Sequence, residues 1–151
     1  MLTLRGTAAL VAGALTLAAS ACGGEGMLSQ EEFQEQGNAI CAKYDKQIED
    51  IPTPTSVEEV PGYVDKALPI VERQIDEMKE LNPPEENQGT FDEMIAEAEK
   101  TVQAGRDLGE AAEENDDAAI EQALNEGNAA SDRADEHATE LGLTDCVDQE
   151  E

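Results

Sequence analysis

Apolar residues after position 28 recur at alternating spacings of three and four, and no segment alternates apolar and polar residues as a half-buried strand does. This period places the apolar side chains on one face of an α-helix. The first helix is predicted to start at a capping box of Ser29 and Glu32 and to stop before Pro52. Leu28 and Phe33 occupy the positions of a hydrophobic staple. Its apolar stripe comprises Phe33, Gly37, Ile40, Tyr44, Ile48 and Ile51, and Cys41 lies at the edge of that stripe.

The second apolar stretch predicts a helix from a capping box of Ser56 and Glu59 to the sequence Asn82-Pro83-Pro84. Pro69 stands in its middle and removes a backbone donor, so we expect a kink near Pro69. A break there into two shorter helices is the alternative.

A third capping box, Thr90 with Glu93, predicts the start of the third helix. Gly105 and Gly109 lie one turn apart on it. In so polar a helix this spacing indicates close approach of a neighbouring helix rather than a membrane dimer.

The fourth helix is predicted to be capped by Asn115 or Asp116 and to end at Leu141, with Gly142 following as a left-handed C-terminal glycine. Leu143 is expected to fold back on the bundle. Four helices of roughly 20 to 26 residues with short linkers predict an all-α fold, an antiparallel up-down-up-down four-helix bundle.

Composition and charge limit both the fold and the partners. Leu, Ile, Val and Phe make up 22 of the 130 residues from 22 to 151, a fraction typical of disordered chains when net charge is high, but their helical spacing favours a folded bundle. The chain has 36 acidic and 9 basic residues and a net charge of −27, which excludes nucleic acid as a partner. A basic partner, weak divalent-cation binding, a salty exterior or simple solubility could each account for the charge.

The N-terminus has the layout of an export signal. Arg5 precedes an uncharged apolar stretch, Ala8 to Ala21, that is too short to span a bilayer. With the small residues Ser20 and Ala21 before Cys22, it resembles a bacterial lipoprotein signal. That resemblance implies removal of residues 1–21 and a lipid such as palmitate on Cys22. An ordinary cleavage after Ala21, leaving Cys22 as the first residue of a soluble product, is the alternative.

The predicted organisation follows from that cleavage. Residues 22–28 form the lipidated cysteine and a short tether, residues 29–146 the helical bundle domain, and residues 147–151 an acidic disordered tail. Loss of Arg5 leaves 8 basic against 36 acidic residues and a net charge of −28. An anionic bilayer repels such a surface, so attachment would depend on the lipid.

Cysteine number supports export independently. Of three cysteines, a lipid on Cys22 leaves Cys41 and Cys146 as an even pair in an oxidising compartment. We expect one disulfide that ties the C-terminal tail to the first helix; two buried free thiols are the alternative. Neither cysteine belongs to a CxxC pair, so thiol redox catalysis and thiolate zinc sites have no support.

Candidate chemistry is sparse elsewhere. His137 is the single histidine, and no Glu-x-x-His pair accompanies it. The acidic run Glu113 to Asp117 does not follow the EF-hand ligand pattern, and it suits the start of a helix, where the helix dipole favours acidic residues. No catalytic, cofactor-binding or metal-ligating residue is therefore assigned, and we expect a protein that is not an enzyme and has no cofactor.

Three further segments carry a family resemblance. Residues 37–45 (GNAICAKYD), 81–84 (LNPP) and 141–146 (LGLTDC) are similar to those of small exported lipoproteins of actinobacteria. The resemblance implies a helical extracytoplasmic domain and no catalytic activity. We expect a non-enzymatic lipoprotein on the outer face of the cell membrane that binds an envelope protein or a wall component; a low-affinity Ca²⁺-binding lipoprotein is the alternative.

Overall fold

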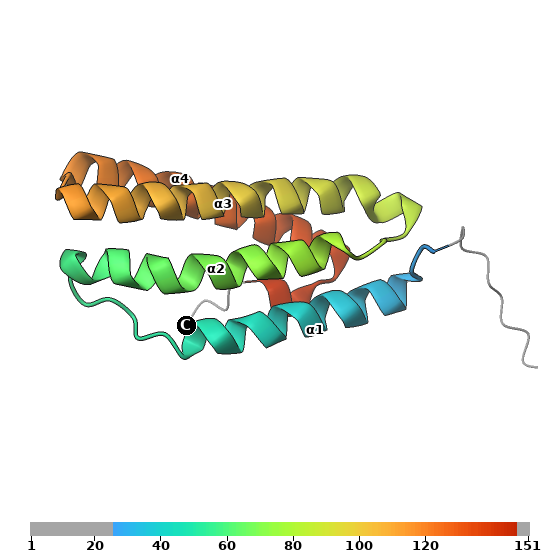
Figure 1. Ribbon diagram of the computed structural model, residues 1–151. Helices are drawn as coiled ribbons and strands as arrows, with labels where there is room; N and C mark the ends of the chain where they lie inside the picture. Colours follow the sequence, from blue (N-terminus) through green and yellow to red (C-terminus); the bar gives the residue numbers. More distant parts are fainter. Residues whose placement is uncertain (1–25, 148–151) are drawn as a thin grey trace, which may run out of the picture.

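The computed structural model describes residues 26–147, which fold into four α-helices and three short 3-10 helices, with no strand among them (Figure 1). The predicted all-α four-helix bundle is confirmed. The predicted signal peptide, Cys22 and the end of the acidic tail lie outside the described residues. The elements are α1 (Gln30–Glu49), η1 (Val57–Glu59), α2 (Val60–Lys79), η2 (Glu85–Asn87), α3 (Gln88–Glu114), α4 (Asp117–Leu141) and η3 (Thr144–Cys146).

Consecutive helices run antiparallel and pack unequally. The long helices α3 and α4 pack along each other, α2 covers α3, and α1 lies on α2 (Figure 1). η3 contacts both α1 and α4. α1 therefore meets α4 at the C-terminal end of α4 and through the C-terminal turn, rather than along the length of the helix.

Two of the predicted helix caps are confirmed. The Ser29 hydroxyl accepts from Glu32 N at 3.3 Å, and the Glu32 carboxylate accepts from Ser29 N at 3.0 Å, which completes the capping box of α1. Hydrogen bonds from Ser29 lower the pKa of Glu32. At α4 the carboxylate of Asp116 accepts from Ala118 N and Ala119 N, at 3.1 Å each.

The other two capping boxes are wrong. The Ser56 side chain makes no capping hydrogen bond, and the Glu59 carboxylate accepts from Thr55 N at 2.8 Å and from the Thr55 hydroxyl at 3.0 Å. α3 starts at Gln88, so Thr90 lies inside the helix and is too late to cap it. In both places a 3-10 turn precedes the helix and takes over its start.

α2 continues through Pro69 as one helix, so the alternative of two shorter helices is wrong. Pro69 lies on the exposed face of α2. Buried residues on both sides of it, Ala67 before and Ile75 and Met78 after, hold the two halves of the helix to the same core. Packing thus offsets the lost backbone donor.

Gly105 and Gly109 let α2 approach α3, as predicted. A Cβ at Gly105 would lie 2.9 Å from Leu68 Cδ2, and one at Gly109 would lie 3.2 Å from Val64 Cγ1. Both contacts are tighter than ordinary packing, so a larger residue at either position would require Leu68 or Val64 of α2 to shift.

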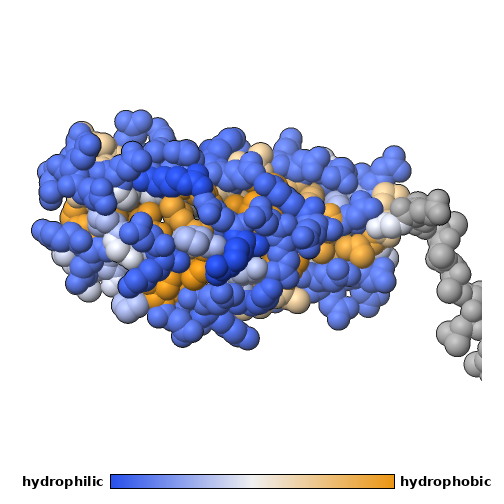
Figure 2. All heavy atoms as spheres, in the orientation of Figure 1, coloured by the Kyte–Doolittle hydropathy of each residue, from blue (hydrophilic) through white to orange (hydrophobic). Residues whose placement is uncertain are grey.

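The core is concentrated where α1, α2, α3 and the C-terminal turn converge. Phe33 and Phe91 meet edge to face with ring centroids 5.5 Å apart. Figure 2 shows hydrophilic residues over most of one face, with apolar atoms confined to gaps between them. None of the described helices is both long and apolar enough to cross a membrane. The buried cluster consists of Phe33, Ile40, Cys41, Tyr44, Ile75, Met78, Phe91, Met94, Ile95, Val102, Ala138, Leu141 and Leu143.

Candidate functional site

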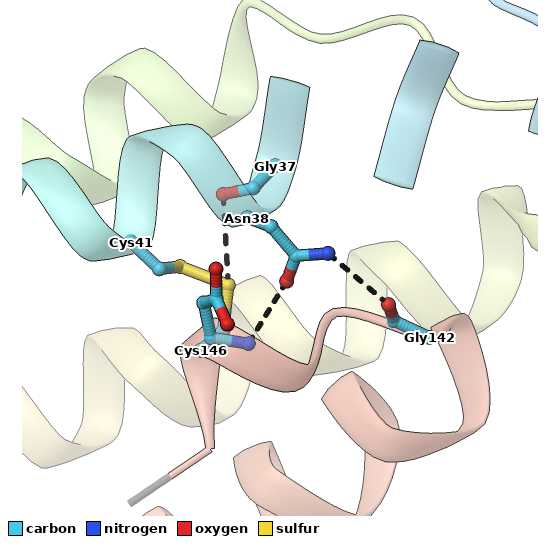
Figure 3. The surroundings of a disulfide bond; sticks show 6 residues. Gly37, Asn38, Cys41, Gly142 and Cys146 are labelled. Carbon is cyan, nitrogen blue, oxygen red and sulfur yellow. Dashed lines mark hydrogen bonds between the residues drawn. A yellow bond between two sulfur atoms is a disulfide. The ribbon is translucent and has the colours of Figure 1, made fainter. Parts of the chain in front are cut away.

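The predicted disulfide joins Cys41 of α1 to Cys146 of η3, with Cα atoms 5.0 Å apart (Figure 3). The alternative of two free thiols is therefore wrong. Cys41 is 2% exposed, and Cys146 Sγ lies 3.7 Å from the carbonyl oxygen of Gly37. The bond closes a loop with a sequence separation of 105, which includes α2, α3 and α4.

A row of amide side chains on α1 binds the end of α4 next to this disulfide. Gln34 Nε2 donates to the carbonyl oxygen of Leu141 at 2.9 Å, and Gln30 Nε2 donates to the same oxygen at 3.3 Å. Asn38 donates to Gly142 O at 3.4 Å and accepts from Asp145 N at 2.9 Å (Figure 3). These bonds satisfy carbonyl groups that a helix end leaves without partners.

The sequence reading missed this row of amides. Residues 30, 34 and 38 are spaced by four and so lie on one line along α1, one turn apart. These amides and Cys41 all contact the segment from Leu141 to Cys146. The spacing by four is the one sequence feature that marks these amides. It does not distinguish them from the solvated amides that are common on helix surfaces.

Leu143 folds back on α1, as predicted, and is fully buried. Gly142 adopts the left-handed conformation with φ 77°, and Leu143 N donates to Ala138 O at 2.8 Å, which ends α4 in a Schellman motif. A Cβ at Gly37 would lie 2.6 Å from Leu143 Cδ2. Because Gly37 has no side chain, Leu143 can pack directly against the backbone of α1 at this position.

Most of the ion pairs in the described residues link neighbouring helices across the exposed surface. Glu97 of α3 is 13% exposed and binds two cations, Lys100 Nζ at 2.6 Å and Arg133 of α4 at 2.9 Å. The hydrogen bond from Lys100 lowers the pKa of Glu97, and the bond from Arg133 acts in the same direction. Between α1 and α2, Glu77 accepts from Lys43 at 2.5 Å and from the Tyr44 hydroxyl at 2.8 Å, which lowers the pKa of Glu77.

The remaining candidate groups are dispersed over the bundle. His137 Nε2 lies 3.9 Å from Glu93 Oε2 at the edge between α3 and α4. In the acidic run from Glu113 to Asp117, Asp116 caps α4 and Asn115 ends α3 in the left-handed conformation. Within residues 26–147, no three His, Cys, Asp or Glu side chains converge as a metal site.

A groove lies between α3 and α4, with a volume of about 450 Å³ and a floor of alanine side chains. Charged residues of both signs stand around it. The chain matches no protein-family model, no curated protein and no solved structure. The function proposed below therefore rests on the sequence and geometry of this chain.

Proposed function

We propose that the protein is an exported lipoprotein, held on the outer face of the cell membrane by a lipid on Cys22. Its helical bundle would serve as a non-enzymatic binding module for an envelope protein or wall component. The disulfide is the observation that carries this proposal. It uses two of the three cysteines and leaves Cys22, directly after the apolar segment, as the odd one. Disulfides persist mainly in oxidising compartments, which supports export.

The start of the bundle suits a short tether. Leu28 N donates to the carbonyl oxygen of Asn82 at 2.8 Å, which ties the chain before α1 to the loop between α2 and α3. Leu28 follows Cys22 by six positions, so a lipid on Cys22 would hold this end of the bundle within about 20 Å of the membrane.

The excess of acidic side chains on the bundle surface supports binding of a positively charged partner. The exposed acidic residues greatly outnumber the cations, five of which are already engaged in ion pairs. Such a surface attracts basic partners and repels acidic ones, and this sets the rate of association more than the affinity. We therefore favour a basic protein or a cationic wall component as the partner.

Metabolic labelling tests the anchor directly. The full-length chain is produced in an actinobacterial host that is fed an alkyne fatty acid, and the cells are extracted with a detergent that separates into two phases. Wild-type protein should carry the label and enter the detergent phase, whereas Cys22→Ser should lose the label and enter the aqueous phase. The matched control, Cys41→Ala with Cys146→Ala, should keep the label. An unlabelled wild type, or a label that survives in Cys22→Ser, would exclude lipidation at this residue.

Crosslinking in intact cells tests the binding module. A partner of the anchored chain should be recovered by crosslinking, and its purified form should bind the bundle saturably and more weakly at high salt. Binding that is insensitive to salt would argue against recognition by the acidic surface.

A further inference from the structure

The three cysteines of the chain allow three different disulfides, and chain length favours a pairing other than the observed one. Cys22 precedes Cys41 by 19 positions, whereas Cys146 follows Cys41 by 105. In an unfolded chain the probability that two residues meet falls with about the 3/2 power of their separation, so the bond between Cys22 and Cys41 is favoured by about 13-fold. The folded chain therefore has to reverse this preference.

Non-covalent contacts hold the C-terminal turn, residues 142–146, against α1. Leu143 is fully buried and packs where Gly37 leaves room for its side chain. Asn38 holds the turn at two points, because its amide group donates to Gly142 O at 3.4 Å and its side-chain oxygen accepts from Asp145 N at 2.9 Å (Figure 3). None of these contacts involves a sulfur atom. They are available to the reduced chain as well as to the oxidised one.

Local hydrogen bonds set the course of the turn itself. Leu143 N donates to Ala138 O at 2.8 Å, and Cys146 N donates to Leu143 O at 3.1 Å. Burial of Leu143 therefore carries Cys146 to α1, where its Sγ lies 3.7 Å from Gly37 O. Cys41 follows Gly37 by four residues, about one helical turn. The docked turn thus brings the two cysteines together without the bond between them.

We propose that the C-terminal turn docks on α1 before the disulfide closes, and that this docking selects the pairing of Cys41 with Cys146 and leaves the Cys22 thiol free. Asn38 and Leu143 are positioning residues, since neither takes part in the thiol chemistry. The importance of a free Cys22 rests on the proposed function, in which that thiol receives the lipid. Selection of the pair itself does not depend on the lipid.

Exposure sets the order of the thiol reactions in the docked chain. Cys146 is partly exposed, whereas Cys41 is 2% exposed, so a small disulfide such as oxidised glutathione reaches Cys146 first. The Cys146 thiolate attacks this oxidant, and one glutathione thiolate leaves. The Cys41 thiolate then attacks the Cys146 sulfur and expels the second glutathione. The oxidant takes up two electrons, and the two cysteine protons pass to the glutathione thiolates.

Refolding of the reduced chain from Cys22 to Glu151 tests the selection without any lipid. All described helices lie within this range. The chain is oxidised in a mixture of reduced and oxidised glutathione, free thiols are alkylated, and the disulfides are identified by peptide mass spectrometry. In native buffer we expect the bond between Cys41 and Cys146 to exceed the mispaired bond between Cys22 and Cys41 by at least ten-fold. Concentrated guanidinium chloride should reverse the order, by about 13-fold from loop length alone.

Two positioning variants and a matched control locate the cause of the selection. Asn38→Ala should raise the ratio of the mispaired to the native disulfide by about five-fold in native buffer, as expected for a lost hydrogen bond. Leu143→Ala removes buried apolar contacts and should raise it further. Gln47→Ala is the control, because Gln47 is an amide on the same helix that accepts instead from Arg73 of α2, and it should leave the ratio unchanged. Circular dichroism confirms that each variant folds.

Hydrogen exchange of the reduced wild type keeps the test decisive if Leu143→Ala fails to fold. The backbone amides of Leu143 and Asp145 donate to Ala138 and Asn38, and we expect them to stay protected from exchange while all thiols are reduced. Exchange of the Asp145 amide at the rate of an unfolded chain, or a pairing ratio that neither positioning variant changes, overturns the inference. A chain that pairs correctly here but carries no lipid in the labelling experiment contradicts the proposed function alone.

Discussion

Removal of the disulfide between Cys41 and Cys146 should cost the bundle a large part of its stability. The bond joins residues separated by 105 positions, and nearly every helix lies inside that loop. In the chain-entropy model, releasing a loop of this length frees the unfolded chain by about 4.7 kcal/mol. Domains of this size are stable by only about 5–15 kcal/mol in total. The loss is therefore between one third and nearly all of the stability.

Two versions of the experiment separate the unfolded-state effect from packing. The reduced wild type keeps both sulfur atoms and reports the loop effect alone. Cys41→Ala with Cys146→Ala also removes the buried sulfur of Cys41, which is 2% exposed, and should lose somewhat more. Alanine is preferred to serine because a hydroxyl buried there would need a hydrogen-bond partner.

Urea unfolding followed by circular dichroism gives the measurement. Thermal unfolding gives a second measurement. With about 2.1 cal/mol/K of unfolding entropy per residue, a loss of about 4.7 kcal/mol lowers Tm by roughly 15–20 °C. The dependence of unfolding free energy on urea should also steepen, since the released chain exposes more surface. A loss below about 1.5 kcal/mol with an unchanged urea dependence would refute the reasoning, because it would mean that the unfolded chain is not constrained by the bond.

Three other predictions follow from named contacts and charges. Gly37→Ala should destabilise the bundle by about 1–3 kcal/mol in urea unfolding, because the new methyl group overlaps Leu143, whereas Gly89→Ala meets nothing within 4 Å and should not destabilise it. The Tm should rise in 1 M NaCl, because salt screens the acidic pairs spaced by four along the helices; an equal or lower Tm contradicts this. The lowered pKa of Glu97 adds stability that is complete above the ordinary glutamate range near pH 4.3 and is lost as pH falls through the lowered value. Carboxyl NMR should find that pKa lowered in the wild type and nearer the ordinary range in Lys100→Met.

The sequence predicted the helices because they depend on a short-range pattern, and it predicted the disulfide because Cys41 and Cys146 are the two cysteines left when Cys22 is set aside. The spacing of apolar residues placed all four helices, and the cap at Ser29 and the turn at Gly142 follow from local geometry that those residues favour. The caps at Ser56 and Thr90 failed for a reason that local patterns do not contain. At Thr90 the 3-10 turn Glu85–Asn87 starts the helix earlier, and at Ser56 the 3-10 turn Val57–Glu59 follows a serine whose side chain makes no capping hydrogen bond.

Contacts between distant segments were harder to foresee. Glu97 could be expected to bind Lys100 on its own helix, but its second cation, Arg133, comes from the next helix and depends on the register of α3 against α4. The groove between α3 and α4 also depends on the register of these two helices. Its lining residues come from both helices, so the groove can be recognised only when their register is known.

The C-terminal turn explains why a small bundle carries so long a disulfide loop. The end of α4 is joined to α1 by the amide hydrogen bonds, by Leu143 packed against Gly37 and by the bond to Cys146, in addition to the buried core that Ala138 and Leu141 share with α1. On its other side α1 is held to α2 by Glu77 and the buried core. Because α1 is the first described helix after Cys22 in the sequence, a pull on the proposed lipid anchor would act on it first. Ala138 and Leu141 of α4 are buried in the same core as Phe33, and the disulfide adds a covalent link between α1 and the segment that follows α4.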